Sequence, residues 1–276
     1  MDIAFLGIDG VGKSTIINSL VPMLRSRGYD PKIVTWRRAM RDSENPFVRD
    51  TLRDLYVGTF RTMFGWADQE PSEKDIWKLF PSESQTFIDT GIEDLLGKLS
   101  LTSNATAGLV ATALVELAGN FFLKHHEIDR LRVNHDIVIQ ETFGYKHIVK
   151  ELLIAREIIN EREEPFAASI VQNILELAER CFMSWLQPTY GFFVRGSPQM
   201  AYEWRLKQSG RVGLIEDFGL ASQHGRDSFV NLQTACDDIF NGYATKCGWP
   251  IIEMQDRPIE LNIGHANDVV LTTIGA

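Results

Sequence analysis

The feature that most constrains the fold of this sequence is a glycine-rich stretch close to its amino-terminal end. An apolar run, Ile3–Leu6, leads into the spacing G-x-x-x-x-G-K-[ST], which is filled by Gly7, Gly12, Lys13 and Ser14. Apolar residues at helical spacing follow directly. A buried strand, a tight loop and a helix in this order are typical of α/β proteins that bind nucleotide phosphates. The pattern therefore predicts an α/β fold with a nucleoside triphosphate site after its first strand.

The chemistry of phosphate binding explains the residue types in this loop. Glycines let backbone N–H groups point inward, and the helix that follows adds unpaired N–H groups and the positive end of its dipole. Lys13 is expected to place its charge on the β- and γ-phosphates of ATP, and the Ser14 hydroxyl is expected to ligate Mg²⁺. The residues expected to contact the ATP phosphates are Gly7, Gly10, Val11, Gly12, Lys13, Ser14 and Thr15.

Composition narrows the range of partners. The net charge of −9 disfavours indiscriminate binding to nucleic acid or to anionic membranes. The most apolar window, Ala107–Gly119, is too short to span a bilayer and contains Glu116. No secretory signal opens the sequence, and its three cysteines lack the spacing of metal ligands. We therefore expect a cytoplasmic protein with reduced thiols and no membrane partner.

Predicted strands alternate with predicted helices along the rest of the sequence. The strands expected after the loop are Lys32–Trp36, His135–Glu141, Tyr190–Val194 and Trp249–Met254. The helices expected between them are Ser14–Arg27, Thr106–Asn134, Tyr145–Glu161, Pro165–Trp185, Ser197–Lys207, Arg226–Lys246 and His265–Ile274. This order predicts one domain over residues 1–276, in which helices cover both faces of a parallel sheet. Residues 39–105 do not follow the alternation, and we expect them to form a helical insertion.

Two acidic residues lie where they could serve the phosphate site. Glu141 ends the third predicted strand, at the sheet edge where α/β proteins bind ligands, so it could hold a water of Mg²⁺ or orient an attacking hydroxyl. Asp9 lies within the loop, where a carboxylate would repel phosphates unless it points away from them, toward a sugar hydroxyl. The alternatives are a solvent-facing acid at position 141 and an aspartate that stabilises its own turn at position 9.

Two groups of cations are further candidates. The segment Arg205–Arg211 carries three cations next to Gly210, and such a segment could close over a triphosphate and neutralise charge during transfer. Arg37 and Arg38 end the second predicted strand, where guanidinium groups would suit a second phosphate. For both groups, exposed surface cations without a ligand are the alternative.

With these residues in view, the sequence resembles the thymidylate kinase family of P-loop kinases, which is close to the deoxynucleoside kinases. The loop Gly7–Thr15 is similar to the family's G-I-D-G-S-G-K-S-T, and the strand Asp136–Glu141 is similar to one that ends in D-R-Y. The resemblance implies a three-layer sandwich with a five-stranded parallel sheet in the order 2-3-1-4-5, and a homodimer. It also implies that Asp9 contacts the acceptor sugar, that Arg37 or Arg38 binds the acceptor phosphate, and that Arg205–Arg211 is a mobile lid.

These observations favour a kinase that uses ATP and Mg²⁺ to phosphorylate a nucleotide-like acceptor, and we favour a (deoxy)nucleoside monophosphate. The expected catalytic residues are Lys13, Glu141, Arg205 and Arg211, with Ser14 and Glu141 at the metal. No acid lies within Thr35–Met40 to act as a base on a neutral hydroxyl, which supports a phosphorylated acceptor. A nucleoside or a hydroxymethylated base in DNA remains an alternative acceptor. A non-catalytic nucleotide switch or ATPase is the alternative class, although the sequence lacks the guanine-reading N-K-x-D.

Overall fold

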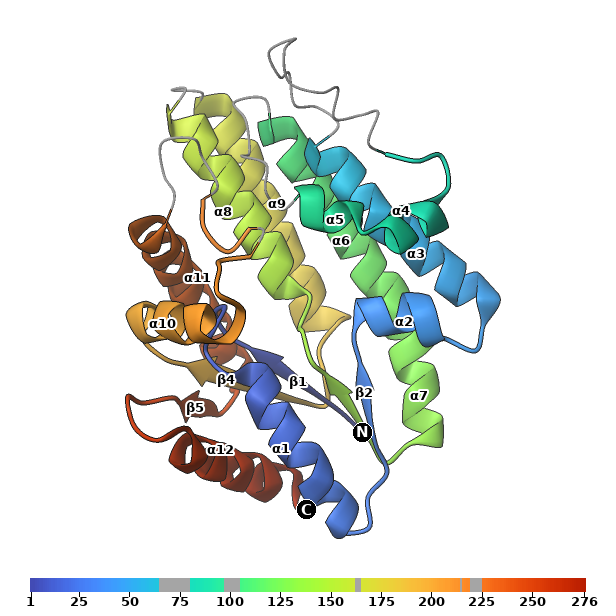
Figure 1. The fold of residues 1–276 in the computed structure, drawn as a ribbon, viewed down its shortest axis with the longest axis vertical. Helices are drawn as coiled ribbons and strands as arrows, with labels where there is room; N and C mark the ends of the chain where they lie inside the picture. Colours follow the sequence, from blue (N-terminus) through green and yellow to red (C-terminus); the bar gives the residue numbers. More distant parts are fainter. Residues whose placement is uncertain (65–79, 97–104, 162–164, 214, 219–224) are drawn as a thin grey trace.

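A five-stranded sheet forms the centre of the protein (Figure 1). The computed structural model describes residues 1–64, 80–96, 105–161, 165–213, 215–218 and 225–276. The strands are β1 (Asp2–Leu6), β2 (Pro31–Val34), β3 (Ile137–Gln140), β4 (Tyr190–Arg195) and β5 (Ile251–Glu253). Every pair of neighbours is parallel, and the order is β2-β3-β1-β4-β5. The predicted α/β class and the order 2-3-1-4-5 are both confirmed.

The first strand lies at the middle of the sheet, which explains its unbroken apolar run. Ile3 lies opposite Ile139 of β3 on one side and Tyr190 of β4 on the other, and all five residues of β1 are buried. A central parallel strand is covered on both faces, so it does not alternate between apolar and polar residues. The loop that follows β1 therefore starts from the buried centre of the sheet.

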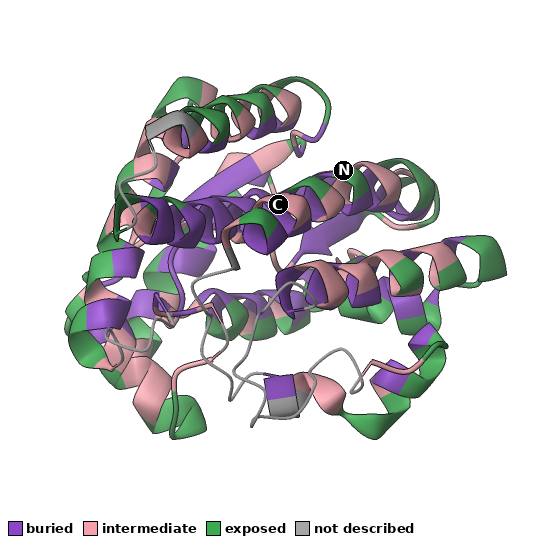
Figure 2. Cartoon of the chain, turned by 90° about the horizontal axis from the view of Figure 1, so that it is seen from above, coloured by how far each residue is buried: buried purple, intermediate pink, exposed green. Residues whose placement is uncertain are grey.

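Helices cover both faces of the sheet (Figure 1). On one side α1 (Lys13–Ser26) packs against α12 (Ile259–Ile274), and α12 also contacts β4 and β5. On the other side α11 (Arg226–Cys247) packs between β4 and α8 (Tyr145–Glu161), and α9 (Pro165–Ser184) packs on α8. Seen from above, most of the sheet is buried, while the outer faces of the helices are exposed (Figure 2).

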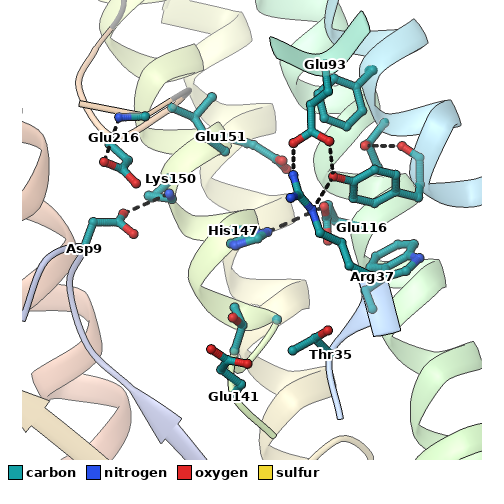
Figure 3. A pocket seen from close by; sticks show the side chains of 18 of the residues that line it. Asp9, Thr35, Arg37, Glu93, Glu116, Glu141, His147, Lys150, Glu151 and Glu216 are labelled. Carbon is teal, nitrogen blue, oxygen red and sulfur yellow. Dashed lines mark hydrogen bonds and ion pairs between the residues drawn. The ribbon is translucent and has the colours of Figure 1, made fainter. Parts of the chain in front are cut away.

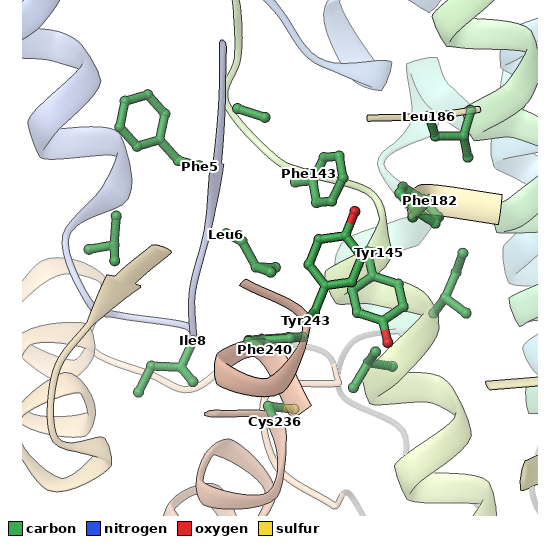
Figure 4. Packing of buried hydrophobic residues seen from close by; sticks show 14 of the residues in the cluster. Phe5, Leu6, Ile8, Phe143, Tyr145, Phe182, Leu186, Cys236, Phe240 and Tyr243 are labelled. Carbon is green, nitrogen blue, oxygen red and sulfur yellow. The ribbon is translucent and has the colours of Figure 1, made fainter. Parts of the chain in front are cut away.

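Aromatic rings fill the space between β4, α8, α9 and α11 (Figure 4). The rings of Tyr145 and Tyr243 have centroids 4.7 Å apart, and Phe143 meets Phe182 edge-on at 5.0 Å. Such pairs stabilise a core beyond the area that they bury. The start of α8 is therefore held rigidly beside the carboxyl end of β3.

One long helical run follows the insertion region and confirms the helix predicted over Thr106–Asn134. It consists of α6 (Ala105–Leu123), a π-helical turn (Lys124–Ile128) and α7 (Asp129–Asn134). Thr106–Asn134 is 29 residues long with a mean hydropathy of 1.5 in its most apolar window, so it could cross a membrane by length and composition. Half of that window is buried, and α6 packs against α3 and α8. This is the environment of a core helix.

Where residues 36–96 are described, they form helices joined by short non-helical segments. It contains α2 (Trp36–Asp42), α3 (Pro46–Phe64), α4 (Ser84–Thr90) and α5 (Ile92–Leu96). Residues 65–79 and 97–104, which belong to the predicted insertion, lie outside the described residues. The prediction that the second strand extends to Trp36 was wrong, because the hydroxyl of Thr35 accepts a hydrogen bond from the backbone N–H of Arg38 and begins α2 there.

Candidate functional site

The loop between β1 and α1, residues 7–12, lies in tight contact with two other elements. A Cβ on Gly7 would lie 2.2 Å from the carbonyl oxygen of Val194 in β4. A Cβ on Gly10 would lie 2.3 Å from the carbonyl oxygen of Ala201 in α10 (Pro198–Ser209). Gly10 also has a φ of +76°, in the left-handed region that side chains rarely adopt. Backbone packing therefore requires glycine at both positions, which explains two of the glycines in the loop.

The side chain of Lys13 folds back under the loop. It is buried, and its Nζ donates to the carbonyl oxygens of Gly7 at 2.8 Å and of Ile8 at 2.6 Å. Burial, and next the nearby ammonium group of Lys146, lower the pKa of Lys13 well below its ordinary value. An anion at this position would supply a counter-charge to the ammonium group.

The start of α1 offers oxygen ligands and backbone donors. Ser14 and Thr15 are exposed in its first turn, and within the described residues no side chain caps Gly12, the residue before the helix. Glu141 lies directly after β3, where its backbone N–H donates to the carbonyl oxygen of Val34 at 3.2 Å. A hydroxyl and a carboxylate fit Mg²⁺, which prefers oxygen ligands and keeps several of its waters. Ser14 and Glu141 are therefore each of a residue type that could hold Mg²⁺ or one of its waters.

Asp9 lies at the centre of an ion-pair cluster, of which Figure 3 shows the pair with Lys150. Its carboxylate pairs with Lys146 and with Lys150, whose Nζ lies 3.0 Å from Oδ2, and both lysines belong to α8. Its backbone N–H donates to Oε1 of Gln233 at 2.9 Å. Burial alone would raise the pKa of Asp9, but the ammonium groups of Lys146, Lys150 and Lys13 outweigh burial and hold the pKa well below its ordinary value. Asp9 is therefore ionised at neutral pH.

A cavity of about 790 Å³ opens beside Asp9 (Figure 3). Six of the residues singled out in the sequence line it, namely Asp9, Arg37, Arg38, Glu141, Arg205 and Arg211. Their elements are separated widely in the sequence, and the parallel sheet brings them to one edge. The volume is within the range of small-molecule sites in proteins. The cavity is therefore the candidate site for an acceptor.

Arg37 is held at one side of the cavity by two neighbours (Figure 3). Its Nε donates to the hydroxyl of Tyr56 at 2.8 Å, and its guanidinium group pairs with Glu93. The Tyr56 hydroxyl donates in turn to Oε2 of Glu93 at 2.8 Å. Arg37 and Arg38 thus lie in the first turn of α2, and not at the end of a strand as predicted. Both nevertheless line the cavity, together with Arg41 one turn further along.

Arg205 and Arg211 approach the cavity from the opposite side. Arg205 in α10 makes a two-point ion pair with the buried Glu216, with N–O distances of 2.8 and 2.5 Å. The helix ends at Ser209, and Gly210 turns the chain in a left-handed conformation toward Arg211. Both arginines line the cavity on the side of Asp9 and Lys150. They are placed to reach an anion bound between the loop and the cavity.

The wall formed by α6 and α8 carries two acidic residues close together. Glu116 and Glu151 are both buried, both line the cavity, and Oε2 of Glu151 has no hydrogen-bond partner among the described residues. Burial, and next the charge of Glu116, raise the pKa of Glu151 well above its ordinary value. The Nδ1 atom of His147 lies 3.7 Å from Glu116. This wall can offer hydrogen-bond donors and acceptors to a ligand.

Several of these residues were missed from the sequence. Lys146 and Lys150 are four residues apart in a helix that is otherwise largely apolar on this face, so they share one side of α8. That spacing, directly after the strand that ends at Glu141, was a signal that could have identified them. Glu216 and Gln233 join the cluster around Asp9 only through the fold, and no local pattern marks them.

Comparisons with known proteins show a similarity only in the overall course of the backbone. No family model matches the sequence, and no curated protein matches it. Two solved structures of deoxyadenosine kinase from M. mycoides are similar along their length, one with the products dCMP and a flexible dCDP, the other with dATP. They are 13% and 12% identical, with TM-scores of 0.41 and 0.43; each alignment covers 100% of this chain, and 99% and 100% of the respective neighbour. With identities and TM-scores this low, the similarity supports no conclusion about the functional site.

Proposed function

We propose that the protein transfers the γ-phosphate of ATP, with Mg²⁺, to a nucleotide-like acceptor bound in the cavity. The observation that carries this proposal is the cavity of about 790 Å³ that adjoins the phosphate loop at Asp9. A nucleotide switch or an ATPase without an acceptor needs no cavity of this size beside its phosphate loop. Cations from α2 and α10 line the same space, as a reaction between anions requires.

The proposed roles follow from position. Lys13 and the loop N–H groups hold the β- and γ-phosphates, and Ser14, with a water held by Glu141, holds the metal. When bound, Mg²⁺ would supply positive charge that neutralises the phosphates. An acceptor oxygen forms a bond to the γ-phosphorus while the bond from that phosphorus to the departing ADP oxygen breaks. Arg205 and Arg211 stabilise the charge during this step, so the protein acts by positioning and charge neutralisation.

The arginines of α2 favour an acceptor that already carries a phosphate. Arg37, Arg38 and Arg41 line one wall of the cavity, and guanidinium groups match phosphate oxygens with two hydrogen bonds. The preferred acceptor is therefore a nucleoside monophosphate, with its phosphate at α2.

A second acceptor class is favoured by a different observation. Glu93 and Tyr56 already engage Arg37, and the carboxyl groups of Glu116 and Glu151 line the cavity nearby. A carboxylate can accept the proton of a neutral hydroxyl as it attacks. A nucleoside, or a hydroxymethylated base in DNA, would present such a hydroxyl.

The experiment that separates these acceptors is a transfer assay with labelled ATP. Nucleosides, their monophosphates, and DNA with hydroxymethylated bases are tested as acceptors. Each acceptor is assayed with wild type and with Lys13→Ala. Transfer of label to a monophosphate by wild type, but not by Lys13→Ala, supports the preferred acceptor. Label on a nucleoside or on DNA supports the second class. Release of labelled phosphate at one rate with every acceptor would contradict the kinase proposal.

A further inference from the structure

Three buried lysines surround one buried carboxylate beside the phosphate loop. Lys13, Lys146 and Lys150 are 8%, 6% and 3% exposed, and Asp9 is 9% exposed. Lys146 and Lys150 both pair with Asp9, whereas Lys13 donates to two carbonyl oxygens of the loop. The cluster therefore contains more positive than negative charge.

Neighbouring acids among the described residues do not correct this imbalance. The charge of Glu216 acts on Lys150, but Glu216 already makes a two-point ion pair with Arg205. Glu151 also lies near Lys150, but burial raises the pKa of Glu151 well above its ordinary value, which favours its neutral form. A buried ammonium group without a full counter-charge is costly. The cluster is therefore electrostatically incomplete until an anion joins it.

Another buried lysine, Lys124, has a balanced set of acidic partners. Lys124 lies 3.0 Å from the fully buried Asp2, at the opposite end of β1, and 3.2 Å from Asp129. Among the described residues Lys124 thus has two acidic partners, whereas Lys146 shares one acid, Asp9, with Lys150. The Asp2 pair is complete without a ligand and can serve as a structural reference.

We propose that Lys146 is a second phosphate-binding lysine, which forms with Lys13 a subsite for the terminal phosphate of a polyphosphate. Asp9 is then the counter-ion that holds Lys146 at the loop when no phosphate is bound. Lys146 and Lys150 are one helical turn apart in α8 and pair with the two carboxylate oxygens of Asp9, and Asp9 and Lys150 line the cavity. In this proposal the subsite lies beside the cavity, so a terminal phosphate bound there is close to an acceptor. This inference deepens the proposed function and rests on its phosphate site.

The test is the binding of tripolyphosphate, measured by isothermal titration calorimetry at fixed salt. We expect Lys146→Met to weaken binding about 10- to 150-fold, the effect of losing a charge-assisted hydrogen bond. Lys146→Arg keeps the charge and should restore most of the affinity. Lys124→Met, which also removes a buried lysine from an ion pair, should change the affinity less than about twofold, because it lies at the other end of β1.

The outcomes separate the inference from the proposed function. If Lys13→Ala abolishes binding while Lys146→Met binds as wild type does, the inference is overturned and the phosphate site stands. If wild type does not bind tripolyphosphate, the phosphate site itself fails, and the proposed function fails with it. Circular dichroism spectra and melting curves show which variants are folded. If Lys146→Met does not fold, Lys146→Gln takes its place, and wild-type affinity in that variant overturns the inference.

Discussion

The Nζ of Lys150 lies 3.0 Å from Oδ2 of Asp9, and this buried ion pair fastens α8 to the phosphate loop. Lys146 pairs with the other oxygen of the same carboxylate. Removing the carboxylate leaves two buried ammonium groups without a partner, whereas removing Lys150 leaves Asp9 paired. We expect Asp9→Asn to lower the free energy of unfolding by about 3–5 kcal/mol, and Lys150→Met to lower it by much less. Urea unfolding at neutral pH measures both values, and equal losses would contradict this account of the cluster.

The contact between Arg37 and Glu93 allows a prediction about how the acceptor binds. If an acceptor phosphate binds Arg37, that phosphate competes with the Glu93 carboxylate. Glu93→Gln should therefore lower the KM for a nucleoside monophosphate, and Arg37→Ala should raise it about 10- to 150-fold. The affinity for ATP should change little in either variant, because the phosphate loop holds ATP independently.

Steady-state kinetics and calorimetry separate these two quantities. Arg61→Ala is a suitable control, since the Arg61 side chain bonds to the backbone carbonyl oxygens of Pro81 and Ser82. If Arg37→Ala and Glu93→Gln leave the KM of a monophosphate unchanged, the acceptor phosphate does not bind at α2. A nucleoside or a hydroxymethylated base would then be the better acceptor.

Arg211 follows the left-handed turn at Gly210 and lines the cavity. If the segment closes over the phosphates only during transfer, most of its interaction belongs to the transition state. Arg211→Ala should therefore lower kcat more than it weakens ATP binding, as measured by single-turnover kinetics and by calorimetry with a non-hydrolysable ATP analogue. A loss in ATP affinity as large as the loss in kcat would contradict a closing segment.

Because of Glu151, the free energy of unfolding should decrease as pH rises. Burial, and next Glu116, raise its pKa in the folded state, so the unfolded chain releases this proton at a lower pH than the folded protein does. As pH rises above the ordinary value of about 4.5, the unfolded state gains stability and the folded state becomes relatively less stable. Glu151→Gln cannot ionise, so its Tm relative to wild type should increase from pH 4.5 to pH 8.

The control for this effect is Glu203→Gln, which changes an exposed acid of α10. Melting curves at both pH values are recorded for the three proteins. A Tm difference between Glu151→Gln and wild type that is the same at both pH values would show that Glu151 is ionised in the folded state.

The parts of the fold that could be predicted are those that short stretches of sequence determine. The loop from Gly7 to Lys13 has a fixed spacing, because backbone approach and phosphate chemistry restrict each position. The strand Ile137–Gln140 and the helix Tyr145–Glu161 follow from local apolar patterns. Arg37 was misplaced because a single capping hydroxyl, that of Thr35, ended the strand earlier than the apolar pattern indicated.

The parts that could not be predicted are those that depend on distant contacts. The pairs of Asp9 with Lys146 and Lys150 join residues 137 and 141 positions apart. Nothing near Asp9 in the sequence indicates that its charge is balanced from α8, or that Gln233 of α11 fixes its backbone. Such contacts arise only when the parallel sheet brings separate crossover helices to one edge.

The decisive test of the kinase proposal is to measure ADP formation from ATP and Mg²⁺ together with phosphorylation of an acceptor. We expect ADP and phosphorylated acceptor to form in equal amounts, ADP formation to be slow without an acceptor, and Lys13→Ala to lower the rate about a thousandfold. ADP formation at one rate with and without every acceptor, or a Lys13→Ala variant as active as wild type, would contradict the proposal.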